Sequence, residues 1–223
     1  MRFRDRSQAG KRLAAELRRF ASRSPVVLAL PRGGVPVGVE VAAALAAPLD
    51  LVLVRKIGAP HQPELAAAAV VDGEQMEIVV NEDVVAGLGL PAGYIEQQAK
   101  RQVEEIERRR RLYLGGRERV AVEGKTAVVV DDGIATGATM RAALRAVRRR
   151  KPAHLVLAVP VAPPETIEAL RHEVDEVVCL VTPEGFYAIG QFYDDFGQVE
   201  DDEVKELLER AAQRAPKPAA GAV

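Results

Sequence analysis

The sequence predicts an α/β fold in which a doubly wound, mostly parallel sheet is flanked by helices. Short apolar runs rich in Val and Leu alternate along the chain with segments in which apolar residues recur at helical spacing. This strand–helix–strand alternation favours a parallel sheet that is covered on both faces. The chain has 223 residues, of which 48% are hydrophobic and 28% are charged. Such a composition is typical of a globular protein with a sizeable core and excludes a disordered chain.

The predicted elements follow one another in a regular order. The first is an amphipathic segment with Leu13, Leu17 and Phe20 on one face. Its charged start argues against a secretory signal. Five buried strands are predicted at 25–30, 49–54, 127–130, 153–159 and 174–181. Helices are predicted at 35–46, 137–149, 164–172 and 203–212.

A long segment, 58–124, separates the second predicted strand from the third. It contains a predicted strand at 76–80 and a long charged helix at 91–114. An insertion of this length is typical of a lid or flap. We therefore expect a single domain over residues 1–213, with 58–124 as an insertion and flexible-loop region. A disordered Pro- and Ala-rich tail is expected at 214–223.

Charge and cysteine content limit the partners. Lys and Arg total 31 against 32 for Asp and Glu, so the net charge of -1 provides no overall field to attract nucleic acid. The single cysteine, Cys179, excludes an intrachain disulfide and a multi-cysteine metal cluster, and it fits a cytoplasmic location. No apolar run approaches the roughly 18 residues of a membrane-spanning helix. Neither nucleic acid nor a membrane is therefore expected as a partner.

Three other features of the sequence do not indicate a site. Serine occurs only at Ser7, Ser22 and Ser24, all before the first predicted strand, which argues strongly against a serine hydrolase. Segment 87–93 resembles a dinucleotide-binding fingerprint, but its third glycine is one residue late, and we interpret it as the end of one helix and the start of another. The basic run 108–111 follows glutamates at pairing distances, as on a solvated helix face.

The most informative segment is 127–140, which reads AVVVDDGIATGATM. It combines a buried strand, two carboxylates and a loop of small residues that opens a helix. Successive backbone N–H groups of such a loop converge on an anion, and the hydroxyls of Thr136 and Thr139 can assist them. The loop lacks the Gly-Lys-Ser/Thr sequence that a nucleoside-triphosphate P-loop needs. Asp131 and Asp132 could accept hydrogen bonds from vicinal hydroxyls, so the pattern indicates a site for a pentose phosphate.

The run VVVDDGIATGAT at 128–139 resembles the phosphoribosylpyrophosphate (PRPP) motif of the type I phosphoribosyltransferases. The family implies a doubly wound core with a flexible loop and a C-terminal hood over the base, and residues 25–197 can be laid on that plan. The resemblance assigns the 5'-phosphate of PRPP to Ile134, Ala135, Thr136, Gly137, Ala138 and Thr139.

Two more segments resemble parts of this family. Residues 29–34 follow the first predicted strand and are similar to the loop that binds the pyrophosphate leaving group. Residues 53–57, placed at the end of the second predicted strand, are similar to the Arg-Lys pair of the adenine phosphoribosyltransferases. The resemblance implies a pyrophosphate site made by Arg32, Gly33, Gly34 and Lys56, and a catalytic set made by Asp131, Asp132, Arg32 and Lys56.

Aromatic residues concentrate near the C-terminus, where five of the nine in the chain lie within 186–196. Aromatic rings can stack on a nucleobase. The segment resembles the hood of the hypoxanthine-guanine enzymes, here at 182–197, which implies that Phe186, Tyr187 and Phe192 contact the base and that Asp194 binds magnesium. A hydrophobic cluster that only pins an irregular segment is the alternative.

Two departures from the 6-oxopurine enzymes bear on the base. Those enzymes carry an acid where this chain has Ala135, and a lysine on the following strand where residues 153–159 have none. Hypoxanthine and guanine are therefore predicted to be poor acceptors. Segment 58–124 is also longer than most flexible loops of the family, so no catalytic residue is transferred onto it.

The leading hypothesis is a phosphoribosyltransferase that transfers the ribose 5-phosphate of PRPP to a nitrogenous base and releases pyrophosphate. The resemblance implies Mg²⁺ as the cofactor, and PRPP and a nucleobase-like small molecule as partners, with a homodimer as an option for the assembly. Two alternatives stay open. One is a regulator that senses PRPP or a nucleotide without turnover, and the other is a hydrolase or phosphorylase that acts on ribose phosphates.

Overall fold

The computed structural model describes residues 1–73, 76–91 and 93–214, with the side chains of Pro63 and Glu64 excepted. Of the tail expected at 214–223, only Arg214 falls within the described residues, as the end of the last helix. None of the helices in these three ranges is long and apolar enough to cross a membrane.

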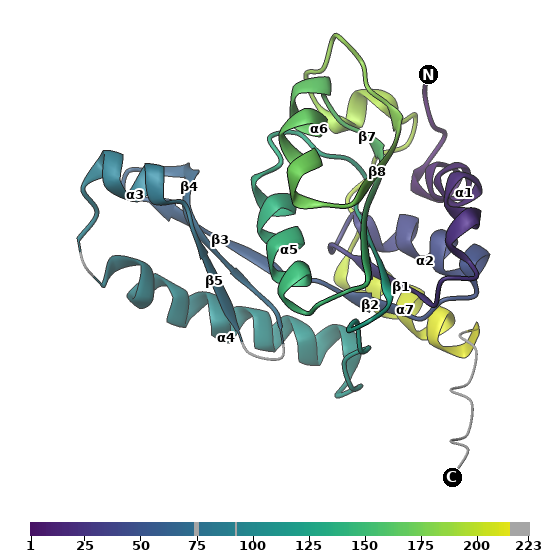
Figure 1. Ribbon diagram of the computed structural model, residues 1–223, viewed down its shortest axis with the longest axis horizontal. Coiled ribbons are helices and arrows are strands. Elements are labelled where there is room, and N and C mark those ends of the chain that lie inside the picture. The colour runs from purple at the N-terminus through teal and green to yellow at the C-terminus, as the bar shows by residue number, and fades with distance from the viewer. Residues whose placement is uncertain (74–75, 92, 215–223) are drawn as a thin grey trace.

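The centre of the fold is a five-stranded sheet in the order β2-β1-β6-β7-β8 (Figure 1). Each neighbouring pair of strands runs parallel. After β1 the chain adds β2 at one edge of the sheet, and it later adds β6, β7 and β8 on the other side of β1. The order of the strands therefore reverses between β1 and β6. The predicted doubly wound, mostly parallel sheet is thus confirmed. Its strands are β1 (Pro25–Ala29), β2 (Leu49–Leu51), β6 (Thr126–Val130), β7 (His154–Val161) and β8 (Glu176–Val181).

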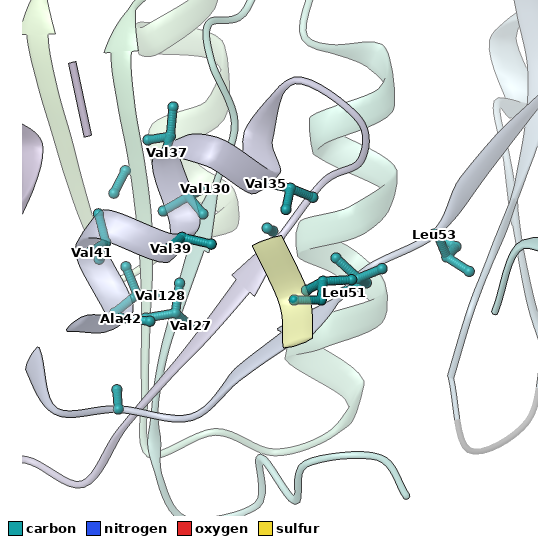
Figure 2. Close-up of a cluster of buried hydrophobic side chains, with 14 of the residues drawn as sticks. Val27, Val35, Val37, Val39, Val41, Ala42, Leu51, Leu53, Val128 and Val130 are labelled. Carbon is teal, nitrogen blue, oxygen red and sulfur yellow. The ribbon is translucent and has the colours of Figure 1, made fainter. Parts of the chain in front are cut away.

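Helices cover both faces of this sheet (Figure 1). On one face, Val27 and Val128 pack with Val35, Val37 and other side chains of α2 in a buried cluster (Figure 2). The residues next to Val27 and Val128 along strands β1 and β6 point to the opposite face of the sheet and pack against α5. The first face carries α1 (Arg6–Leu17), α2 (Gly34–Leu45) and α7 (Asp201–Arg214), and the second carries α5 (Ala138–Arg149) and α6 (Pro164–Leu170). Short 3-10 turns lie at Arg18–Phe20, Arg171–Glu173 and Ile189–Phe192.

The segment predicted as an insertion forms a second unit that reaches away from the main sheet (Figure 1). The predicted strand at 76–80 and the predicted helix at 91–114 are confirmed with slightly shorter bounds. The end of one helix and the start of the next, expected within 87–93, are also confirmed. The unit consists of an antiparallel sheet of β3 (Val54–Ala59), β4 (Gln62–Val71) and β5 (Glu77–Val80), followed by α3 (Glu82–Leu88) and α4 (Tyr94–Leu114).

The strand predicted at 49–54 is confirmed only over Leu49–Leu51, and its predicted end is wrong. Strand β2 ends at Leu51, and Val54 already begins β3 in the other sheet. The N–H of Val52 still donates to the carbonyl of Ala29, at 3.0 Å, whereas the carbonyl of Leu53 accepts from Asp72, at 2.9 Å. The chain therefore changes sheets within two residues. A continuous apolar run does not reveal this change because Leu51, Val52 and Leu53 are all buried across it.

Candidate active site

The site lies at the carboxyl ends of β1 and β6, where the order of strands reverses. Ligands of open α/β sheets bind at such a point. The N–H of Leu30 donates to the carbonyl of Val130 at 3.0 Å, so the two loops leave the sheet side by side. A Cβ atom on Gly34 would lie 2.9 Å from that carbonyl and 3.0 Å from the Cα of Asp131. The loop after β1 and the loop after β6 therefore pack backbone to backbone.

The two acids of the motif occupy different environments. Asp131 is half-buried, and its Oδ1 accepts the N–H of Asp132 at 2.8 Å. Asp132 is buried. Burial, followed by the neighbouring Asp132 carboxylate, raises the pKa of Asp131 well above its ordinary value. Burial also raises the pKa of Asp132, although the guanidinium of Arg6 opposes this shift.

Two residues that the sequence analysis missed hold Asp132. Arg6, at the start of α1, donates from Nε to Oδ2 of Asp132 at 2.7 Å, and from Nη1 to the carbonyl of Gly197 at 2.8 Å. The guanidinium carbon of Arg6 lies 3.9 Å from the centre of the Phe196 ring. The hydroxyl of the buried Tyr193 donates to the carbonyl of Asp132 at 2.6 Å. No local sequence pattern predicts the contact between Arg6 and Asp132, because the two residues are 126 positions apart.

The predicted phosphate loop has the backbone form expected of an anion site. Gly137 has a φ of 77° and stands at the N-cap of α5, where no side chain caps the helix. The first N–H groups of a helix have no partner within the helix, and together with the helix dipole they favour an anion. Thr136 is exposed and Thr139 is half-buried, so both hydroxyls lie at or near the surface.

The start of this loop is fixed to strand β7 and helix α6. Ile134 is buried, and its N–H donates to the carbonyl of Val161 at 3.0 Å. The carbonyl of Ala135 accepts from the hydroxyl of Thr166 at 2.7 Å. Ala135, Thr136 and Ala138 are nevertheless exposed. The loop is therefore preorganised while its middle stays open to solvent.

The two cations predicted for pyrophosphate have different neighbours. Arg32 follows β1, is half-buried, and its Nη1 lies 3.5 Å from carboxylate oxygens of both Glu200 and Asp201 at the start of α7. Lys56 lies on β3 rather than at the end of β2. It lines a cavity of ≈ 300 Å³ between the antiparallel sheet and α5, which Ala138 and Arg141 also line. Lys56 is therefore placed beside the start of α5.

The predicted hood contains both exposed and buried aromatic residues. Tyr187 is 93% exposed, whereas Phe192 is only 7% exposed and belongs to a cluster with Phe3 and Tyr193. Phe186 is half-buried and stacks on Phe192, with 5.7 Å between ring centres. Of the three predicted base contacts, Tyr187 presents its ring to solvent, and Phe192 anchors the segment in the core instead.

The chain near its N-terminus holds the hood in place. The N–H of Phe3 donates to the carbonyl of Phe192 at 2.8 Å, and the N–H of Asp194 donates to the carbonyl of Phe3 at 2.9 Å. The carboxylate of Asp194, the candidate magnesium ligand, is exposed and lies 3.2 Å from Nε of Arg2. Among the described residues, no group of three or more His, Cys, Asp and Glu side chains is placed to hold a metal ion.

Comparisons with known proteins show the family of this chain. Residues 4–196 match the family model described as "Phosphoribosyl transferase domain". Two proteins of Mycobacterium tuberculosis, strains H37Rv and CDC 1551, are each 47% identical to this chain over 209 residues, and their names assign them provisionally as phosphoribosyl transferases Rv0571c and MT0597. The match covers 94% of this chain and 47% of each relative, so the chain spans about half the length of these relatives.

A solved structure supports the fold at high sequence identity. The crystal structure of TT1426 from Thermus thermophilus superposes with a TM-score of 0.83 at 45% identity, and the match covers 94% of this chain and 99% of that one. The family match extends from α1 to the hood and includes the acidic pair, the loop at the start of α5 and the loop after β1. The chain therefore belongs to the phosphoribosyl transferase family.

Proposed function

We propose that the protein transfers the ribose 5-phosphate of PRPP to a nitrogenous base and releases pyrophosphate. The observation that supports this most is the convergence of three features at the carboxyl ends of β1 and β6. These are the uncapped start of α5, the half-buried Asp131, and the loop of Arg32, Gly33 and Gly34. They match, in turn, the 5'-phosphate, the ribose hydroxyls and the pyrophosphate of PRPP.

Each feature has a defined task in this reaction. The backbone N–H groups around Thr136–Thr139 bind the 5'-phosphate, and Asp131 accepts a hydrogen bond from a ribose hydroxyl. Arg32 exchanges its two 3.5 Å contacts with Glu200 and Asp201 for the pyrophosphate, since such exposed pairs are weak. The bond from ribose C1 to pyrophosphate oxygen breaks and a bond from C1 to a nitrogen of the base forms. Catalysis then depends on positioning, charge stabilisation and exclusion of water rather than on a covalent nucleophile.

The protein side chains fit a magnesium ion that arrives with its substrate. Mg²⁺ is usually bound by one or two carboxylates together with substrate phosphates, and Asp194 offers one exposed carboxylate beside the hood. When bound there, the ion would neutralise charge on the pyrophosphate. Asp194 would exchange its contact with Arg2 for this role.

Alanine substitution of Arg32 and of Lys56 is expected to weaken the binding of inorganic pyrophosphate and PRPP, with little effect on ribose 5-phosphate. Each side chain contributes a charge-assisted hydrogen bond worth about 1.5–3 kcal/mol, or roughly tenfold or more in affinity. Calorimetric titration with the three ligands measures the contrast. Equal losses for all three in Lys56→Ala would show that Lys56, which lies near Ala138, serves the 5'-phosphate instead.

The test of the function is turnover of PRPP with Mg²⁺ and a panel of bases, followed as formation of nucleotide and pyrophosphate. Adenine, a pyrimidine or an unusual base is expected to exceed hypoxanthine and guanine. Tyr187 can stack on any planar base, but Ala135 replaces the acid and strand β7 carries no lysine for a 6-oxo edge, and an unpaired polar group costs roughly 1–3 kcal/mol.

Other outcomes of the same assay separate the alternatives. Release of pyrophosphate without any base indicates a hydrolase, and tight binding of PRPP without turnover on any base indicates a sensor. Turnover on hypoxanthine or guanine above every other base would contradict the acceptor prediction and would assign base reading to backbone groups of the hood. Heat-denatured protein at the same concentration controls for spontaneous breakdown of PRPP.

A further inference from the structure

Asp132 is enclosed by three parts of the chain that are far apart in sequence. Helix α1 supplies Arg6, the hood supplies Tyr193, and the loop after β1 supplies Gly33. A Cβ atom on Gly33 would lie only 2.1 Å from Oδ2 of Asp132 and 2.6 Å from its Cγ. The carboxylate therefore lies directly against the backbone of the loop that is proposed to bind pyrophosphate.

The ion pair between Arg6 and Asp132 is nearly closed to solvent. The two side chains are 12% and 11% exposed, and their bond of 2.7 Å has the length of a charge-assisted hydrogen bond. Arg6 is fixed in turn by the carbonyl of Gly197 and by the ring of Phe196. A buried carboxylate that loses its cation is strongly unfavourable, so Asp132 without Arg6 would take up a proton or turn toward water, and in either case it loses the contact that fixes it.

Asp131 differs from Asp132 in each of these respects. The residue is half-buried rather than buried, and its Oδ1 accepts a hydrogen bond from the backbone N–H of its neighbour Asp132. Arg6 donates to Asp132 and not to Asp131. The same two-residue motif thus contains one carboxylate that accepts the N–H of its neighbour and one that is held in an ion pair with Arg6.

We propose that Arg6 is a positioning residue, which holds Asp132 against Gly33 and so fixes the pyrophosphate loop, while Asp131 is the acid that binds the ribose hydroxyls. The division of labour between the two acids rests on the proposed function. The role of Arg6 as a clamp on the loop requires only the contacts described above. The start of α1 is therefore part of the site, although it precedes the motif by more than a hundred positions.

The clamp is tested by hydrogen exchange in the protein without ligand. The amides of Gly34 and Val35 are bonded to the carbonyls of Leu30 and Arg32, so they report on the loop. In Arg6→Ala we expect these two amides to exchange about tenfold faster or more. Arg6→Lys, which keeps the charge, should restore part of the protection, and Arg18→Ala, which removes an exposed arginine after α1, should match the wild type.

Unchanged exchange at Gly34 and Val35 in a folded Arg6→Ala protein would overturn the clamp. Equal acceleration in Arg18→Ala, or in Arg6→Lys, would also overturn it, since a general loss of stability would then be the cause. If Arg6→Ala does not fold, Arg6→Gln answers the same question, because it keeps a hydrogen-bond donor and removes the charge. Loop exchange in Arg6→Gln at the wild-type rate then counts against the clamp.

The division of labour is tested by titrating ribose 5-phosphate and inorganic pyrophosphate, each with Mg²⁺. Asp131→Asn should lower the affinity for ribose 5-phosphate by about tenfold or more, and Asp132→Asn by less than about threefold. Arg6→Ala should weaken pyrophosphate more than ribose 5-phosphate. An equal loss of ribose 5-phosphate affinity in the two aspartate variants would overturn the division. If the wild type binds neither ligand, the proposed function and the division both fail, and the exchange result alone decides the clamp.

Discussion

The Asp131→Asn variant is expected to lose most of its affinity for PRPP and to become more stable near neutral pH. A charge-assisted hydrogen bond to a ribose hydroxyl is worth about 1.5–3 kcal/mol, which corresponds to roughly tenfold to more than a hundredfold in affinity. The gain in stability has a different cause. Burial and the adjacent Asp132 carboxylate raise the pKa of Asp131 in the folded protein, so its ionised form is disfavoured there and an uncharged amide is not.

The free energy of unfolding, measured as a function of pH, tests whether the Asp131 carboxylate destabilises the folded protein. The folded wild type binds a proton at Asp131 more readily than the unfolded chain does, so its free energy of unfolding should rise as pH falls toward the raised pKa. The rise should be smaller in Asp131→Asn. Asp202→Asn is the matched control, since that side chain is 89% exposed. An Asp131→Asn protein that binds PRPP as tightly as the wild type, or that unfolds more easily at neutral pH, would contradict the assignment.

Gly33→Ala is expected to abolish most binding of pyrophosphate. Gly33 has a φ of -60° and a ψ of -33°, which alanine adopts freely, so backbone conformation is not the obstacle. The obstacle is space, because the new Cβ would lie 2.1 Å from Oδ2 of Asp132. Either the carboxylate leaves Arg6 or the loop moves. Overpacking of this kind costs about 1–3 kcal/mol, so affinity for pyrophosphate should fall roughly fivefold to more than a hundredfold.

Calorimetric titration with inorganic pyrophosphate and Mg²⁺ measures this loss. Gly185→Ala, in the hood, provides the control, because a Cβ atom there meets nothing within 4 Å. Thermal melting of both variants separates local from global effects. Wild-type affinity in Gly33→Ala would show that Asp132 does not press on the loop in solution.

The sequence was sufficient to predict the central sheet and those parts of the candidate site that lie within one short segment. Local patterns predict strands β6 and β7, which are continuous apolar runs. A local pattern of small residues at a helix start likewise predicts the loop before α5. Strand β4 escaped prediction because its core is a run of alanines, which favours a helix in isolation. In the structure, Ala68 and Ala69 are buried in the clusters on opposite faces of the small sheet, and packing overrides propensity.

The remaining parts of the site depend on contacts between distant positions. The pairing of Arg6 with Asp132 and of Phe3 with Phe192 has no periodic signature that a single sequence can show. The aromatic cluster was predicted as a group, but only the structure separates the exposed Tyr187 from the buried Phe192. Those two rings lie five positions apart, and the short 3-10 turn at Ile189–Phe192 is not long enough to give a periodic pattern that sets their directions.

The pairing of residues near the start of the sequence with the hood bears on when the site is completed during folding. The contacts that join Arg2 to Tyr193 and Arg6 to Gly197 each span 191 positions. Contacts of such high sequence separation close the largest loops in the chain and are typically gained late in folding. The parallel sheet can therefore assemble before Asp132 has met its cation. We expect the ability to bind ligand to be the last native property acquired, after the sheet has formed.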